Sequence, residues 1–411
     1  MKFNKWTLGL AALGVVSLAS AARADEKLSP VQTALSNTTL SGYVDVAANW
    51  RPGTDSGSAG GPNIPASAFS KNDGFSLNAV DLALDKPMDE GPWASGYHVE
   101  LMFGPNSVPA ANNFFGGAGG SEGFGSLRQA YVSLRTPVGN GIDWKVGVFD
   151  TIIGYESTSG PLNPNYTRSY GYSIEPTTHT GVLASYKVTD VLTLSAGVAN
   201  TWNANSAGLS GVNNNATYES QKTYMGSITL TAPESFGALK GATLTLGAIN
   251  GVDQSIAAGG PGSQTSWYAG LALPTPSSKL KLGAAFDYLT FNNRGGANTK
   301  DDSIWVAGLY TTISPTDKLS FNFRGEIVDA TQIGSSIVAP VSPNPLNGYY
   351  AGHYAGEVTA TMQYQLWANV LSRVEFRWDH VDADSGADKA FGVNNTKRND
   401  FLLALNLVYQ F

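Results

Sequence analysis

The most regularly spaced charges lie near the end of the chain, where Arg373, Glu375, Arg377 and Asp379 occupy every second position. Large apolar residues stand between them. Residues two apart share one face of a β-strand, so the pattern predicts one charged face and one apolar face. Such charges either set a transverse field across an aqueous channel or neutralise one another and keep a wall wet. Because acid and base are interleaved, mutual neutralisation is favoured.

A second group of chemically capable residues lies in the longest predicted connection, residues 150–177. It combines carboxylates, one cation and tyrosines: Asp150, Glu156, Glu175, Arg168, Tyr155, Tyr166, Tyr170 and Tyr172. Folded into a channel, this loop would form a constriction with an acidic lip that favours cations and aromatic faces that could guide sugars. The alternative is a loop on the outer surface whose tyrosines pack on one another.

No catalytic constellation accompanies these groups. The four histidines are scattered, and residues 119–123 fit a nucleophile elbow only in a Gly-rich stretch with no helix after it. The absence of cysteine excludes a disulfide framework, thiolate metal sites and attached haem. We therefore expect no enzyme, no cofactor and no metal; a barrel phospholipase or protease is the alternative, which hydrolysis of lipid or peptide would reveal.

The elements that must position these residues are strands. Period-two alternation recurs about 16 times, in segments of the ~9–11 residues that a tilted strand needs to cross a bilayer. The predicted strands begin at Thr39, Phe75, Trp93, Leu127, Ile142, Thr178, Val191, Thr223, Ala242, Thr265, Leu280, Ser303, Leu319, Tyr354, Leu371 and Asp400. Around Ala79 and Val80 the apolar phase shifts, which predicts a β-bulge or a misplaced strand.

Long and short connections alternate along the chain, which is typical of a transmembrane barrel with long loops on one rim and tight turns on the other. The sequence therefore predicts an all-β fold, a transmembrane antiparallel up-and-down β-barrel of about 16 strands over residues 39–411. Alternation then places a set of charged side chains on the lumen wall: Arg135, Lys145, Arg324, Glu326, Arg373, Glu375, Arg377, Asp379, His98 and Glu100.

The N-terminus carries an export signal. Lys2 and Lys5 precede an apolar run over residues 6–18, and Ala22-Arg23-Ala24 forms a small-x-small cleavage site. We expect a signal peptide at residues 1–24 and a short periplasmic segment at residues 25–38. The whole chain has a net charge of −7, and removing the basic signal makes it more acidic, so nucleic acid is a poor partner.

The last eleven residues, 401–411, alternate large apolar residues with smaller or polar ones and end on Phe411. This strand resembles the closing strand of bacterial outer-membrane β-barrels, whose terminal aromatic residue is read by the insertion machinery. The resemblance implies that this machinery, the outer-membrane lipid bilayer and lipopolysaccharide are partners. An ordinary edge strand of a soluble sheet would alternate in the same way.

A more specific resemblance lies between residues 127 and 186. Its motifs are Leu127-Arg128-Gln129-Ala130-Tyr131-Val132, Gly147-Val148-Phe149-Asp150-Thr151-Ile152-Ile153-Gly154-Tyr155-Glu156 and Glu175-Pro176-Thr177-Thr178-His179-Thr180-Gly181-Val182. Here the chain resembles the putative β-barrel porin family, OmpL-like type, which implies a porin in the outer membrane of a diderm bacterium. It implies no particular solute. The Pro-Glu-Phe-Gly-Gly turn of trimeric general porins is missing, so no constriction residues are carried over and a homo-oligomer stays open.

The sequence thus predicts an outer-membrane porin, a passive diffusion channel for small hydrophilic solutes or ions. Its acidic net charge predicts a weak preference for cations. The alternative is a structural or adhesive outer-membrane barrel that its own loops close.

Overall fold

The computed structural model describes most of the chain after residue 36. The described residues are 37–53, 73–104, 106, 126–203, 221–253, 262–275, 277, 279–292, 302–329, 331, 354–382, 391 and 397–411. The predicted signal peptide, most of the predicted segment 25–38, the Gly-rich stretch 119–123, His353 and large parts of the other long loops lie outside them. The statements below concern the described residues.

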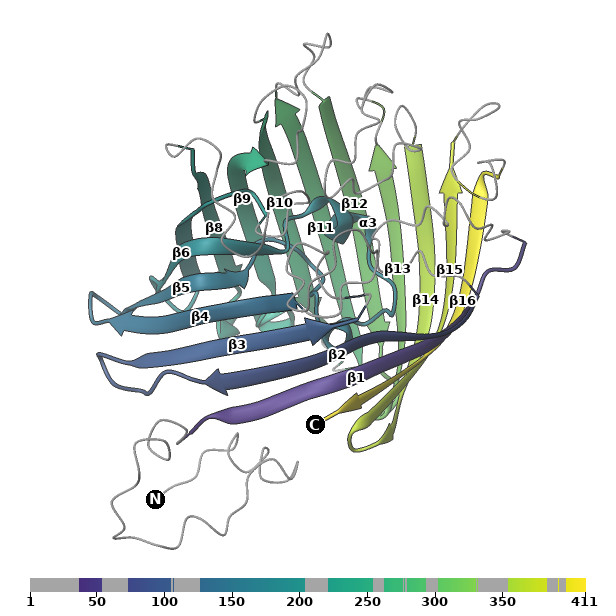
Figure 1. Cartoon of the computed structure of the whole chain (residues 1–411), viewed down its shortest axis with the longest axis horizontal. Helices are drawn as coiled ribbons and strands as arrows, with labels where there is room; N and C mark the ends of the chain where they lie inside the picture. Colours follow the sequence, from purple (N-terminus) through teal and green to yellow (C-terminus); the bar gives the residue numbers. More distant parts are fainter. Residues whose placement is uncertain are drawn as a thin grey trace, which may run out of the picture.

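Sixteen antiparallel strands form one closed barrel in which each strand pairs with its neighbours in sequence, and β16 pairs with β1 (Figure 1). The strands are β1 (Thr39–Trp50), β2 (Gly74–Lys86), β3 (Ser95–Phe103), β4 (Ser126–Thr136), β5 (Ile142–Asp150), β6 (Thr178–Lys187), β7 (Leu192–Ala199), β8 (Thr223–Thr231), β9 (Thr243–Asp253), β10 (Gly262–Pro274), β11 (Leu280–Asn292), β12 (Asp302–Ile313), β13 (Leu319–Asp329), β14 (Tyr354–Trp367), β15 (Val370–Val381) and β16 (Asn399–Gln410).

The C-terminal residue helps to close the barrel. The backbone N–H groups of Gly42 and Phe411 each donate to the other residue's carbonyl oxygen, both at 3.0 Å. This exchange extends the β1–β16 ladder, in which Tyr43 lies opposite Gln410. Closure removes the unpaired sheet edge that an open sheet would leave in lipid.

The two faces of the strands differ as alternation predicts. On β16, Leu403, Leu405 and Leu407 point outward, and Leu405 is 56% exposed. Ala404 and Asn406, between them, are buried inside. An apolar outer surface around a polar interior is the arrangement that a lipid-embedded barrel requires.

The predicted fold class is therefore confirmed, and each observed strand begins within three residues of its predicted start. The predicted bulge is also present: the β1–β2 register shifts between Asp45 and Val46, so that Asn78 is the extra residue on β2. In the part of the chain that the structure describes, no helix has the length and apolarity to cross a membrane.

The connection between β5 and β6, residues 151–177, is called the third loop here. It contains two short helical pieces, η3 (Gly160–Leu162) and α3 (Tyr170–Ile174). Figure 1 shows α3 within the ring of strands, and α3 contacts β11 and β12. Ile153, Tyr170 and Ile174 of the loop belong to the main buried apolar cluster. The loop therefore folds into the barrel, and the alternative of a loop on the outer surface is wrong.

Candidate functional site in the barrel lumen

Two wall glutamates bind the backbone of the third loop. Glu375 of β15 accepts the N–H groups of Tyr166 at 2.5 Å and Thr167 at 2.9 Å. Glu326 of β13 accepts those of Tyr170 at 2.5 Å and Gly171 at 3.2 Å. Each carboxylate thus holds two consecutive amides that no helix or strand would otherwise satisfy. These contacts therefore fix the loop backbone to β13 and β15.

The wall arginines bind the carbonyl oxygens of the same loop. Arg324 donates to the Thr167 carbonyl at 2.8 Å, and Arg377 donates to the Arg168 carbonyl at 2.6 Å. Arg373 donates to the Asn163 carbonyl at 2.5 Å. The alternating charges of β15 therefore match alternating donors and acceptors of the loop backbone.

Acidic partners balance these buried guanidinium groups. Arg324 lies between Glu156 of the loop, at 2.7 Å, and Glu357 of β14, at 2.6 Å. Arg377 makes two hydrogen bonds to Asp379, of 2.7 and 2.8 Å, and Asp379 also accepts the Tyr170 hydroxyl at 2.8 Å. The network meets the requirement that buried charges be paired and hydrogen-bonded.

Glu175, which follows α3, is held in a different environment. Burial, together with the nearby carboxylate of Asp287 on β11, raises the pKa of Glu175 well above its ordinary value. Close by, Tyr155 stacks on Tyr310 of β12 with ring centroids 3.9 Å apart. This part of the loop therefore meets the wall through two close carboxyl groups and a stacked pair of tyrosines rather than through an ion pair.

These contacts correct two expectations from the sequence. The wall charges on β13 and β15 point inward as alternation predicts, but they are not solvated: Arg324 is 1% exposed and Arg377 0%. Most of the predicted constriction residues are buried against that wall: Glu156, Arg168, Glu175, Tyr166 and Tyr170. Their side chains anchor the loop, because a loop that crosses a wide lumen must satisfy its own backbone. The buried tyrosines cannot offer their faces to a sugar.

Three further predicted residues are Tyr172, Arg135 and Lys145. Tyr172 is half-buried and donates its hydroxyl to Thr158 at 3.0 Å. Arg135 pairs with Asp143 at 2.6 Å, with both side chains partly exposed. Lys145 lies 4.6 Å above the ring centroid of Tyr131. Tyr172 thus belongs to the anchored part of the loop, in α3, whereas Arg135 and Lys145 do not contact it.

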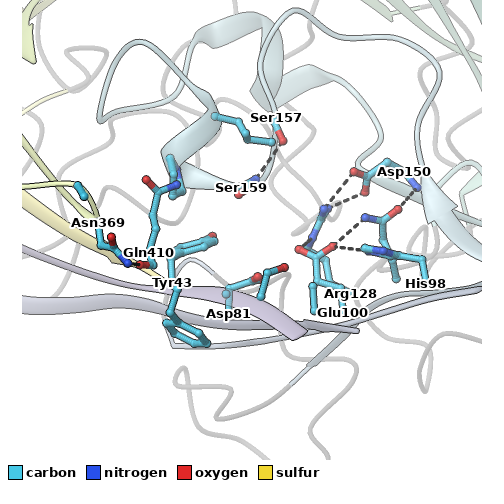
Figure 2. A pocket seen from close by; sticks show the side chains of 18 residues that line it. Tyr43, Asp81, His98, Glu100, Arg128, Asp150, Ser157, Ser159, Asn369 and Gln410 are labelled. Atoms are coloured by element: carbon cyan, nitrogen blue, oxygen red, sulfur yellow. Dashed lines mark hydrogen bonds and ion pairs between the residues drawn. The ribbon is translucent and has the colours of Figure 1, made fainter. Parts of the chain in front are cut away.

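Beside the loop, a cavity of about 510 Å³ remains open against β1–β4; we call it the acidic cavity (Figure 2). Its ionisable residues are Tyr43, Asp81, His98, Glu100, Arg128 and Asp150. Arg128 pairs with Glu100 at 2.5 Å and with Asp150 at 2.6 Å. Three carboxylates thus face one guanidinium and one imidazole. Of the predicted constriction residues, only Asp150 lines this cavity.

A second cavity, of about 580 Å³, lies on the other side of the loop tip against β9–β14. Pro161 and Leu162 line both cavities, so the tip of the loop separates them. Tyr155 lines this second cavity together with Tyr268 and Lys281. Among the residues that line this second cavity, Lys281 alone has a formal charge at neutral pH, so the two cavities differ in the sign of their charge.

Sequence reasoning missed several residues of the candidate site: Tyr43, Asp81, Arg128, Asp287 and Glu357. Arg128 stands within a motif that carries the family resemblance, which was a usable signal. Asp81 follows the bulge at Asn78, where the alternation breaks, so its inward direction could be predicted only after the bulge was placed.

A family model described as Putative beta-barrel porin-2, OmpL-like, matches residues 37–411. Among solved structures, the chain is similar to the outer-membrane channel DcaP of Acinetobacter baumannii, with 14% identity, 91% of this chain and 97% of that chain covered, and a TM-score of 0.57. It is also similar to an anion-selective porin from Comamonas acidovorans, with 12% identity, 91% and 99% coverage and a TM-score of 0.58.

A third similar structure is the trimer form of OmpT, an outer-membrane protein of Vibrio cholerae, with 10% identity, 91% and 99% coverage and a TM-score of 0.54. At these identities the likeness concerns the fold alone. No curated protein sequence matches the chain.

Proposed function

The chain belongs to the family described as Putative beta-barrel porin-2, OmpL-like, and we propose that it is a passive diffusion channel for small hydrophilic solutes and ions, with a weak preference for cations. It is an outer-membrane β-barrel. The observation that carries the proposal is the acidic cavity, which remains beside β1–β4 while the third loop is fixed to β13 and β15. The driving force is the gradient of the solute itself.

The preference for cations rests on the charges of the acidic cavity. Asp81, Glu100 and Asp150 outnumber Arg128 and His98 there, and carboxylates along a passage favour cations. The arginines of β13 and β15 do not oppose this preference, because the loop covers them. Anion selectivity belongs to the Comamonas acidovorans porin, and a shared fold at 12% identity does not transfer it.

Two measurements test the proposal. Liposomes containing the folded protein should swell in isotonic solutions of small sugars and amino acids, and control liposomes should not. In a potassium chloride gradient across a planar bilayer, the reversal potential should have the sign of potassium permeation. A reversal potential of the opposite sign would refute the cation preference and leave diffusion itself standing.

A second candidate function is a structural or adhesive barrel closed by its loops. One observation favours it: the third loop buries the whole inward charged face of β15, as expected of a plug. Absence of both swelling and conductance in correctly folded protein would favour this function.

The assembly of the protein is also proposed from the sequence. Residues 1–24 serve as the signal peptide, and residues 25–38 remain in the periplasm. The insertion machinery reads the C-terminal strand that ends on Phe411, and the finished barrel contacts lipid and lipopolysaccharide. A trimer form is described for OmpT of Vibrio cholerae, which makes a homo-oligomer a reasonable expectation for this chain.

A further inference from the structure

One carboxyl group of the acidic cavity, that of Asp81, has another carboxyl group, Glu100, as its hydrogen-bond partner. Asp81 points inward from β2, opposite Tyr43 of β1, and is 5% exposed. Its Oδ2 atom has no hydrogen-bond partner among the residues that the structure describes. The carboxylate of Glu100, on β3, adds electrostatic repulsion. A buried carboxylate in such surroundings is costly unless a cation pairs with it or a proton neutralises it.

The neighbouring cations are already committed to other carboxylates. Glu100 accepts hydrogen bonds from Arg128 Nε at 2.5 Å and Gln129 Nε2 at 2.8 Å, and its Oε2 lies 3.3 Å from His98 Nε2. The two terminal nitrogens of Arg128 bind Asp150 at 2.6 and 3.1 Å. These groups form a network on one side of the cavity, as Figure 2 shows. The network reaches Asp81 through the carboxyl group of Glu100, which leaves Asp81 Oδ2 without a partner among the described residues.

The surroundings of Asp81 suit an organic cation. The side chain lies beside the ring of Tyr43 in Figure 2, with Ser157 and Ser159 of the third loop across the cavity. A guanidinium or ammonium group can form a charge-assisted hydrogen bond with a single carboxylate oxygen. A metal ion needs more ligands, and no group of three or more His, Cys, Asp or Glu in the described part of the chain could hold one.

We propose that the acidic cavity binds small solutes with a guanidinium or ammonium group, and that Asp81 is the carboxylate that pairs with this group. The proposal rests on the proposed channel function, because the cavity is the passage in that account. Solutes of this class would be concentrated at the cavity and pass more readily than neutral solutes of equal size. An anionic solute would meet three carboxylates and be disfavoured.

The test uses L-arginine and L-citrulline, which differ mainly in that an uncharged ureido group replaces the guanidinium. L-arginine added to single open channels in symmetric potassium chloride should interrupt the current in a concentration-dependent way, and L-citrulline should do so far less. Asp81→Asn should raise the L-arginine concentration for half-block by about tenfold or more, a change of at least about 1.4 kcal/mol.

Asp143→Asn is the matched control variant. It removes the same charge from the lumen side of β5, where Asp143 pairs with Arg135. It should leave the half-block concentration within about twofold of wild type, well under 1.4 kcal/mol. Equal weakening in both variants would show a general effect of charge and overturn the role of Asp81, as would unchanged block in Asp81→Asn.

A calorimetric titration of L-arginine into the folded, detergent-solubilised protein separates the two proposals. Open channels without block and without calorimetric binding would overturn the cation site and leave the channel function intact. Closed channels with binding that Asp81→Asn abolishes would refute the channel function and support the site. Asp81→Asn must show the same heat-modifiable gel mobility as wild type, so that lost binding is not lost folding.

Discussion

Arg324 of β13 and Glu156 of the third loop form a buried ion pair, with 2.7 Å between Nη1 and Oε1, although 168 positions separate them in the chain. The same guanidinium donates to Glu357 at 2.6 Å and to the Thr167 carbonyl at 2.8 Å. The Arg324 side chain therefore links β13 and β14 to two points of the third loop, Glu156 and Thr167. This relationship determines where the loop lies and which part of the lumen stays open.

Arg324→Ala should destabilise the barrel and loosen the loop. It leaves Glu156 and Glu357 buried without their guanidinium partner, and breaking a buried pair in this way costs about 3–5 kcal/mol. The temperature at which the folded gel band is lost should fall, and single-channel current should become noisier. Arg135→Ala is the control, because its pair with Asp143 is partly exposed and such pairs contribute about 0–1 kcal/mol. Equal losses in both variants would contradict the account.

Deletion of residues 155–173, replaced by a short Gly-Ser linker, should raise the single-channel conductance. These residues include η3 and all of α3 except Ile174, and they separate the two cavities. Their removal should join the cavities into one wider passage. Unchanged conductance in a folded variant would show that the loop does not limit the current.

Glu175 predicts a pH dependence of loop docking. Its pKa in the folded protein is raised above 4.5 by burial, then by Asp287. Protonated Glu175 therefore stabilises the folded protein fully at a pH below the pKa that this residue has in the unfolded chain. This stabilisation is lost as the pH rises through the higher pKa of Glu175 in the folded protein. The unfolding temperature should fall on the alkaline side more steeply for wild type than for Glu175→Gln, which stays neutral. The same slope in both proteins would exclude Glu175 as the titrating group.

The outward face predicts a cost for charge in lipid. Leu405 lies near the middle of β16 and is 56% exposed. Leu405→Lys in a bilayer should cost about 2–4 kcal/mol, because a cation at the midplane is poorly solvated. Ala83→Lys, which places the same charge in the acidic cavity, should cost far less. Unfolding by denaturant in liposomes compares them, and a reversed order would mean that the faces are wrongly assigned.

The strands could be predicted from the sequence because their signal is local. Alternation along β15 alone decides that Arg373, Glu375 and Arg377 share one face, and a closed barrel makes that face the interior. The third loop could be predicted to be long and polar. Its position in the lumen, however, depends on contacts with residues that are far away in the sequence. One example is Asn165, which donates to Thr361 at 2.7 Å across 196 positions.

The partners of the charged wall residues could not be predicted from the sequence, and the reason is physical. Glu326 and Glu375 bind backbone N–H groups, and almost any residue type supplies such a group. No pattern in the loop sequence therefore predicts that the loop contacts the wall. Asp81 escaped prediction because Asn78 shifts the register of β2 by one residue and so reverses the apparent faces.

The central claim is that the barrel conducts while its third loop is docked. Single-channel recording of the purified, heat-modifiable protein in a planar bilayer tests it most directly. The account predicts stable open steps in symmetric potassium chloride from wild-type protein. An absence of steps from folded protein, with steps appearing only after residues 155–173 are deleted, would contradict it and show that the docked loop closes the barrel.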